Sequence, residues 1–414
     1  MTGQGSANSI WAVTDVPPRL GYPNGFSSRV YHFLKSVAEC WPLDVLALRR
    51  EGADWTRENF LPDDLPVCHF WYEPLPADPL NSPGVKGRLR RAGHYLRDPL
   101  PYMSYPRRLA GLNEHLSVHA PRLAIFFLPY TAHLALQLPA SVPRVYVLEE
   151  GWERSLDWAT RNLPAILRVW VNGTEKARVD RLYRRIASRG EPVVAISNIE
   201  KDWFKRVIPE DQITTIPHAV DCEFFSPESK KQDLDISIFG NFSQGRTGKE
   251  AVDLYRYAES SVRRTGVRRT WAFVGKGPTD EMLALRSSQA MVTGQVPDFR
   301  PYYARTKVVV VPASYGTGVK TTVLEAWATG RPVVATSFAL NGLPASPGEN
   351  VLVGDTPGEL LGHVRSLLDS PDLRLRLGEA GLETVRRERN IHVLAKNFAE
   401  LCADTLRANP STTW

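Results

Sequence analysis

KVVVVPASYGTGVKTTVLEAWATGRPVVATSFALNGL, residues 307–343, is the stretch that decides the fold. Its first residues, 307–311, form an apolar run rich in valine, which is typical of a buried strand. The glycines of residues 316–318 predict a turn, and the apolar spacing in residues 321–328 predicts a helix. Residues 332–335 are a second apolar run. Strand, loop, helix and strand in this order predict a right-handed crossover unit of a parallel sheet.

The turn at residues 316–318 is a candidate anion site. Such a loop places backbone N–H groups and the positive end of a helix dipole at the carboxyl edge of the sheet, where anions bind. Lys320 adds a full positive charge there, and Glu325 lies one turn further into the helix. Gly240 and Gly275 follow two other predicted strands, and glycine at a strand end lets a ligand approach the backbone. Together they favour a nucleotide or phosphate cleft.

Size and composition limit the possible classes of protein. A chain of 414 residues suggests two domains, and 43% hydrophobic with 23% charged residues is typical of a soluble globular protein. The net charge of +6 is compatible with nucleic acid, an anionic membrane surface or a phosphorylated substrate as partner. The four cysteines lie far apart without metal-binding spacing, which favours the cytoplasm. We expect neither a signal peptide nor a membrane span, although the protein could lie against a membrane.

Apolar runs predict strands throughout the chain, and helical segments alternate with them. The predicted strands are residues 10–16, 43–48, 67–72, 123–128, 144–148 and 193–197 in the first half, and 236–239, 271–274, 291–292, 308–311, 333–335 and 351–353 in the second. This alternation predicts an α/β protein with two doubly wound parallel sheets. A turn-rich segment at 208–234 indicates the boundary. We assign residues 1–207, with a returning helix at about 390–414, to one domain and 208–389 to the other.

Two basic segments interrupt the first half, at residues 86–108 and 176–189. The second predicts an amphipathic helix with arginines on its outer face. These arginines are Arg178, Arg181, Arg184 and Arg185. Both segments are best explained as solvated basic faces, and contact with an anionic lipid surface or a phosphorylated acceptor is the alternative.

Six motifs in order resemble one known family. ISIFGN at 236–241, WAFVGKGP at 271–278 and the stretch 292–343 are similar to the donor-binding half of GT-B glycosyltransferases of the family 4 type. TTIPHAVDCEFFSP resembles the linker of that family, ENVLVGDTPGELLGHVRSLLDSPDLRLRLGEAG its C-terminal segment, and PPRLGYPNGFSSRVYHFLKSVA its N-terminal loop and first helix. The resemblance implies the GT-B architecture, with two Rossmann-like domains and a cleft between them. It also implies a nucleotide-sugar donor on the C-terminal domain, an acceptor on the N-terminal domain, and retention of configuration.

The resemblance also implies roles for residues of the second half. Glu325 would bind the ribose hydroxyls, because an ionised carboxylate can accept from both. The amides of residues 318–322, with Lys320, would stabilise the departing diphosphate without a metal, since no Asp-x-Asp cluster is apparent. The expected donor site comprises Gly240, Asn241, Arg246, Lys249, Gly275, Gln295, Val296, Gly316, Thr317, Gly318, Val319, Lys320, Thr321, Thr322 and Glu325.

The chain departs from the family pattern at three places. Thr317 stands where the family often has the first glutamate of a pair, which leaves the identity of the donor sugar open. Asn241 stands where an arginine is common, so Arg246 and Lys249 are the nearby cations. His218 replaces the asparagine of the linker, and a loop role is favoured over catalysis.

The acceptor side is predicted from the first half. The expected acceptor-binding residues are Asn24, Gly25, Arg29 and His133. Glu149 and Glu150 end a predicted strand and, with Lys320, are the candidate catalytic residues, because a carboxylate there could act as a base or stabilise a carbocation. A tight turn at Asn24 and an acidic loop cluster at Glu149 explain the same residues without a function.

The sequence therefore predicts a cytoplasmic glycosyltransferase that moves a sugar from a nucleoside diphosphate to an acceptor hydroxyl. It is expected to need no cofactor or metal, to bind no nucleic acid, and to be able to contact the inner face of an anionic membrane. Two alternatives stay open. A nucleotide-sugar epimerase would share the architecture, and a non-enzymatic polyanion or membrane-binding protein would use the basic segments alone.

Overall fold

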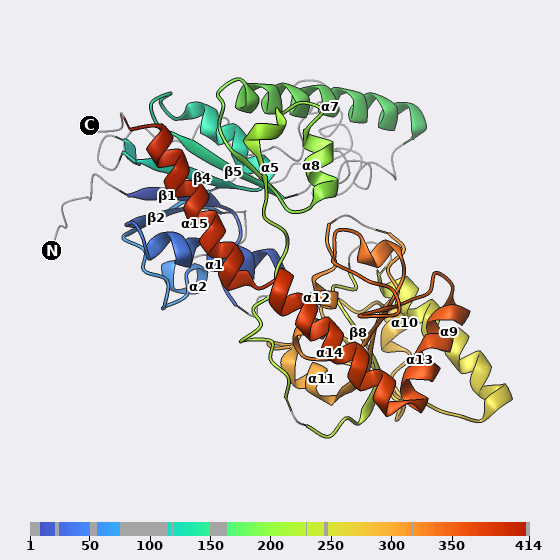
Figure 1. Cartoon of the computed structure of the whole chain (residues 1–414). Coiled ribbons are helices and arrows are strands. Elements are labelled where there is room, and N and C mark those ends of the chain that lie inside the picture. The colour runs from blue at the N-terminus through green and yellow to red at the C-terminus, as the bar shows by residue number, and fades with distance from the viewer. Residues whose placement is uncertain are drawn as a thin grey trace. The chain divides into compact units, whose positions relative to one another are not determined.

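The chain forms two compact units (Figure 1). The computed structural model describes residues 9–20, 25–49, 56–74, 115–116, 120–149, 164–228, 230–243, 247–315 and 318–410. The first unit comprises Met1–Leu20, Phe26–Pro217 and Ala395–Trp414, and the second comprises Gly21–Gly25 and His218–Leu394.

The first unit is built on a parallel sheet of seven strands in the order β3-β2-β1-β4-β5-β6-β7. The strands are β1 (Ile10–Thr14), β2 (Leu43–Arg49), β3 (His69–Pro74), β4 (Leu123–Phe127), β5 (Arg144–Glu149), β6 (Val193–Ala195) and β7 (Ile213–Thr215). Every residue of β1, β4, β5 and β6 is buried, which explains the apolar run that forms most of each strand. The strand order reverses between β1 and β4.

Helices cover this sheet, and the end of the chain completes its core. The helices are α1 (Gly25–Ala38), α2 (Arg57–Phe60), α5 (Pro129–Ala132), η2 (His133–Gln137), α7 (Ala165–Ala187), α8 (Asn198–Phe204), η3 (Glu210–Gln212) and α15 (Ile391–Ala408). Phe398 of α15 stacks on Phe33 of α1 with ring centroids 4.3 Å apart. Phe398 also lies 6.2 Å from Phe127 of β4, so the last helix contributes directly to the first hydrophobic core.

The second unit has a parallel sheet of six strands in the order β10-β9-β8-β11-β12-β13. The strands are β8 (Leu234–Phe239), β9 (Trp271–Val274), β10 (Ala290–Val292), β11 (Thr306–Val311), β12 (Val333–Ala335) and β13 (Leu352–Val353). The helices are α9 (Thr247–Thr265), α10 (Asp280–Leu283), α11 (Arg300–Arg305), α12 (Thr321–Ala328), η4 (Phe338–Leu340), α13 (Pro357–Asp369) and α14 (Pro371–Glu388). Here the strand order reverses between β8 and β11.

Helix α12 is held tightly in the second core. Trp327 is fully buried, and its Nε1 donates a hydrogen bond to the Asn350 carbonyl oxygen at 3.0 Å. A Cβ added to Gly381 of α14 would lie 2.3 Å from Trp327 Cδ1, so only glycine fits beside the indole ring. The helix that carries Glu325 therefore has one fixed position in its unit.

Two elements differ from the sequence prediction. Strand β7 lies inside the turn-rich segment assigned to the boundary, and it pairs with β6 in the first sheet. Three residues are too few to show a strand periodicity. Helix α7 begins at Ala165, well before the predicted start at residue 176. The prediction missed the first turns because they lack the amphipathic pattern of the later ones. Among the described residues, no helix combines the length and apolar character needed to cross a bilayer.

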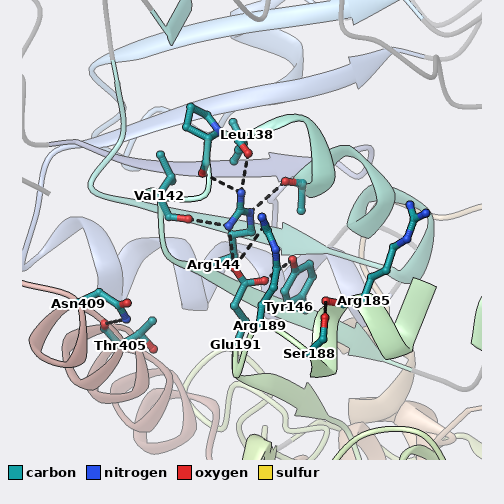
Figure 2. A network of polar contacts seen from close by, with 12 residues as sticks. Leu138, Val142, Arg144, Tyr146, Arg185, Ser188, Arg189, Glu191, Thr405 and Asn409 are labelled. Carbon is teal, nitrogen blue, oxygen red and sulfur yellow. Dashed lines mark hydrogen bonds and ion pairs between the residues drawn. The ribbon is translucent and has the colours of Figure 1, made fainter. Parts of the chain in front are cut away.

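A buried arginine joins the start of β5 to the segment before it (Figure 2). The Arg144 guanidinium donates to the carbonyl oxygens of Ala135 at 3.0 Å, Leu138 at 2.7 Å and Val142 at 2.8 Å, and pairs with Glu191 Oε1 at 2.6 Å. Tyr146 donates to the other Glu191 oxygen at 2.7 Å, and burial, together with this carboxylate, raises the pKa of Tyr146. The network satisfies a buried charge completely.

Replacing Arg144 should therefore destabilise the fold. Arg144→Met leaves Glu191 buried without its main partner, and we expect the free energy of unfolding to fall by about 3–5 kcal/mol. Arg189→Gln is the matched control, because Arg189 is 29% exposed and lies 3.9 Å from the same carboxylate; its expected cost is below about 1 kcal/mol. Urea unfolding of both variants measures the difference, and equal losses would contradict the assignment.

Candidate functional site

The strand order of the second sheet indicates where a ligand binds. In open parallel sheets, ligands bind at the carboxyl ends of the strands where the order reverses. That point lies between β8 and β11. Gly240 follows β8 directly, and Ser314 lies in the segment after β11. The first strand of the stretch 307–343 therefore ends at the point where the strand order reverses.

The strand ends at this edge are lined by backbone rather than by side chains. Gly240 and Gly275 have positive φ angles of 159° and 147°. A Cβ added to Gly275 would lie 1.8 Å from the Gly240 carbonyl oxygen, so no other residue fits. Gly275 N–H donates to Thr293 Oγ1 at 3.3 Å, which connects β9 to the end of β10. Glycine at position 275 thus lets the ends of β8 and β9 pack closely against each other.

Two of the predicted donor residues are Asn241, in the turn after β8, and Lys249, in the first turn of α9. Asn241 Oδ1 accepts hydrogen bonds from Ser243 N at 3.2 Å and Ser243 Oγ at 2.7 Å, so this side chain shapes the turn after β8. Lys249 is exposed and pairs with Asp253 at 2.5 Å. An exposed pair of this kind contributes little energy, so Lys249 can exchange Asp253 for a phosphate group.

Glu250 is a residue of this edge that the sequence does not reveal. Its Oε1 accepts from Ser314 N at 3.1 Å and from Ser314 Oγ at 2.5 Å. The contact holds the segment after β11 against the first turn of α9. Because the two residues are separated by 64 positions in the sequence, only their places after strands β8 and β11 hint at this contact.

The start of α12 has the features of an anion site. Gly318 adopts a left-handed conformation with φ 73°, and the first turn contains no acidic residue. Lys320 is the N-cap residue, and its side chain does not cap the helix. Its Nζ lies 5.8 Å from the centroid of the Phe338 ring. The first N–H groups of an α-helix have no partner within the helix, so those around Thr321 and Thr322 can serve a ligand.

Glu325 is set in place by a stacked aromatic pair. The Tyr303 hydroxyl of α11 donates to Glu325 Oε2 at 2.9 Å, and the Tyr303 ring stacks on Phe239 of β8 with centroids 3.9 Å apart. Burial raises the pKa of Glu325 to about 7, although the hydrogen bonds from Tyr303 and Thr321 lower it in part. The carboxyl group is therefore divided between its two protonation states near neutral pH, and hydroxyl donors would favour the ionised one.

Other predicted residues are placed more simply. Gln295 is exposed and Val296 packs against the second core, both after β10. Gly25 begins α1, and His133 begins η2. Some predicted residues lie outside the described residues, and their predictions stay untested; these are Asn24, Glu150, Arg246, Gly316 and Thr317.

Arg29 and Glu149 form a buried pair in the first unit. Arg29 is 1% exposed, its Nη2 donates to the Ile216 carbonyl oxygen at 2.7 Å, and its Nε lies 3.4 Å from Glu149 Oε1. Burial lowers the pKa of Arg29, and the Glu149 carboxylate opposes this effect. Glu149 ends β5 with a positive φ of 59°. A buried pair tied to the main chain favours a structural role over contact with an acceptor.

Comparisons with known proteins bear on this arrangement. Residues 235–370 match the sequence model of the family Glycosyl transferases group 1. No curated protein sequence matches the chain. Sucrose-phosphate synthase from Thermosynechococcus elongatus is similar in structure, with a TM-score of 0.69 and 16% identity over 97% of this chain and 100% of that one. A glycosyltransferase from Rickettsia africae has a TM-score of 0.64 and 14% sequence identity to this chain, over 97% of this chain and 98% of that one. Anabaena HepE in complex with UDP and glucose has a TM-score of 0.62 and 14% sequence identity, over 95% of this chain and 99% of that one.

The comparisons agree with the architecture of the chain. The two parallel sheets and the likeness to these structures show the GT-B fold, as the sequence predicts. The match to the model of the family Glycosyl transferases group 1 covers residues 235–370, within the second unit, and the likeness to the solved structures shows the fold alone. The finer likeness to family 4 stays a prediction.

The raised pKa of Glu325 gives the stability of the protein a specific pH dependence. The folded-state pKa of Glu325 is about 7 and lies above the ordinary value of 4.5. The stabilising contribution of its protonated form is therefore present in full below pH 4.5. That contribution is lost as the pH rises through about 7. The difference in unfolding free energy between wild type and Glu325→Gln should therefore change over this range, by roughly 2–3 kcal/mol.

Urea unfolding at several pH values measures this difference. Glu383→Gln, which removes an exposed carboxylate of α14, is the control and should show a much smaller change. A difference between wild type and Glu325→Gln that stays constant from acid to neutral pH would contradict the raised pKa of Glu325.

Proposed function

We propose that the protein transfers a sugar from a nucleoside diphosphate sugar to an acceptor hydroxyl, with the donor bound at the β8–β11 edge of the second sheet. One observation carries the proposal: a backbone-lined edge, the start of α12 and the preset carboxylate of Glu325 occur together within one unit. The complex of HepE with UDP and glucose supports the same class of donor.

The chemistry of the leaving group fits these residues. As the glycosidic bond to the diphosphate breaks, negative charge develops on the phosphate oxygens, and preset N–H donors stabilise it without reorganisation. The amides at the start of α12, together with Lys320 and Lys249, provide such donors and cations. Glu325 would accept hydrogen bonds from the ribose hydroxyls and so fix the nucleoside. We expect no divalent metal to be required.

Three finer features belong to the same proposal. Transfer would proceed with retention of configuration, as the resemblance to family 4 implies. The acceptor would bind to the first unit, with the region of His133 and Asn24 as candidates. The location would be cytoplasmic. Exclusion of water from the reacting centre would be needed, because hydrolysis of the activated sugar competes with transfer.

A melting-temperature screen with nucleoside diphosphates tests donor binding. We expect a saturable rise in the melting temperature with one base, starting the screen with UDP, and no effect of the nucleoside without phosphate at equal concentration. Glu325→Ala should weaken binding by roughly ten- to a hundredfold, because it removes hydrogen bonds to a charged group. Glu383→Ala is the control and should bind normally.

Product analysis then distinguishes sugar transfer from epimerisation of the donor. Donor with acceptor should yield a glycoside with the donor's anomeric configuration, and EDTA should leave the rate unchanged. Epimerised donor in the absence of acceptor would favour the epimerase alternative. Binding of no nucleoside diphosphate at all would contradict the proposal.

A further inference from the structure

Helix α7 extends beyond the core that it covers. Its later turns pack on the first unit through Val179, Leu182, Tyr183 and Ile186, which are at most 7% exposed. Its first turns do not. Ile166 is 88% exposed, Val169 71% and Trp170 42%. Three large apolar side chains in five consecutive residues are thus exposed at the N-terminal end of this helix of 23 residues. Figure 1 shows the course of α7 as a long, straight helix.

The exposed apolar residues share a face with arginines. At about 100° per residue, Ile166, Trp170, Arg181 and Arg184 lie within roughly 60° of one another, opposite the buried side chains. Gly173 lies on the same line between them, and nothing lies within 4 Å of the position of a Cβ there. The outer face of α7 is therefore apolar in its first part and cationic in its last, over about 27 Å.

The charge of this helix is strongly positive. It carries six cationic side chains, Arg168, Lys176, Arg178, Arg181, Arg184 and Arg185. The acidic residues are Glu175, which is fully buried, and Asp180, which is half-buried. Arg185 extends away from the polar network of Arg144, whereas Arg189 reaches toward Glu191 in that network (Figure 2). Arg181, Arg184 and Arg185 are exposed, so the later turns of α7 present positive charge at the surface.

We propose that the outer face of α7 docks the protein on an anionic lipid bilayer. Ile166, Val169 and Trp170 would enter the boundary between headgroups and acyl chains, where tryptophan is favoured. Arg181 and Arg184 would contact the lipid phosphates. A nucleic acid matches the cations but gains nothing from exposed Ile166 and Val169, so the combination favours a membrane. The proposal concerns the first unit and does not depend on the transfer reaction.

Flotation of the full chain with vesicles tests the proposal, using phosphatidylcholine with and without an equal share of phosphatidylglycerol. We expect binding to the anionic vesicles only. Ile166→Ser/Trp170→Ser should lower the partition coefficient by roughly tenfold or more, since it removes the inserted apolar surface. Arg181→Gln/Arg184→Gln should lower it by roughly fivefold per arginine, the attraction of one cation to an anionic leaflet.

A matched control comes from the second unit. Leu375→Ser/Arg376→Gln removes an apolar residue that is 62% exposed and its exposed cationic neighbour on α14, and it should bind vesicles as the wild type does. Unchanged melting temperatures show that all variants are folded. Three results would overturn the proposal. The first is that the wild type does not bind anionic vesicles. The second is that the Ile166→Ser/Trp170→Ser variant binds vesicles as the wild type does while the protein binds RNA in a salt-sensitive way, and the third is that this variant loses self-association without any effect on vesicle binding.

Discussion

The hydrogen bond from Tyr303 to Glu325 is the interaction on which the proposed donor site depends. It joins α11 to α12 at 2.9 Å, and the stacking of the same tyrosine on Phe239 joins both to β8. A carboxylate held in this way is desolvated and oriented before any ligand arrives. The anchoring of Trp327 at Gly381 and Asn350 fixes the helix itself, so Glu325 and the N–H groups of α12 keep a constant relation within the unit.

Much of this arrangement could be predicted from the sequence, because it depends on local patterns. The helix at residues 321–328 has the predicted bounds, since glycines flank it and its apolar face repeats regularly. Contacts between distant residues carry no such signal. The bond of Glu250 to Ser314 and the burial of Arg29 against Glu149 both arise from tertiary packing, which a single sequence does not show.

Basic residues in the first unit have two different roles, one in the buried core and one at the surface. Arg144 and Arg29 are buried, and carbonyl and carboxylate oxygens of the fold neutralise them. The arginines of α7 lie on the surface beside exposed Ile166 and Trp170. In the sequence all of them contribute equally to a net charge of +6. Only the fold separates the charges that stabilise it from those left for a partner.

A crystal structure of the protein with its nucleoside diphosphate tests the central claim most directly. The diphosphate should lie over the first turn of α12 between the ends of β8 and β11, with the ribose hydroxyls hydrogen-bonded to Glu325. A nucleotide bound at another edge of the sheet, or a Glu325 carboxylate that makes no contact with the ribose, would contradict the account.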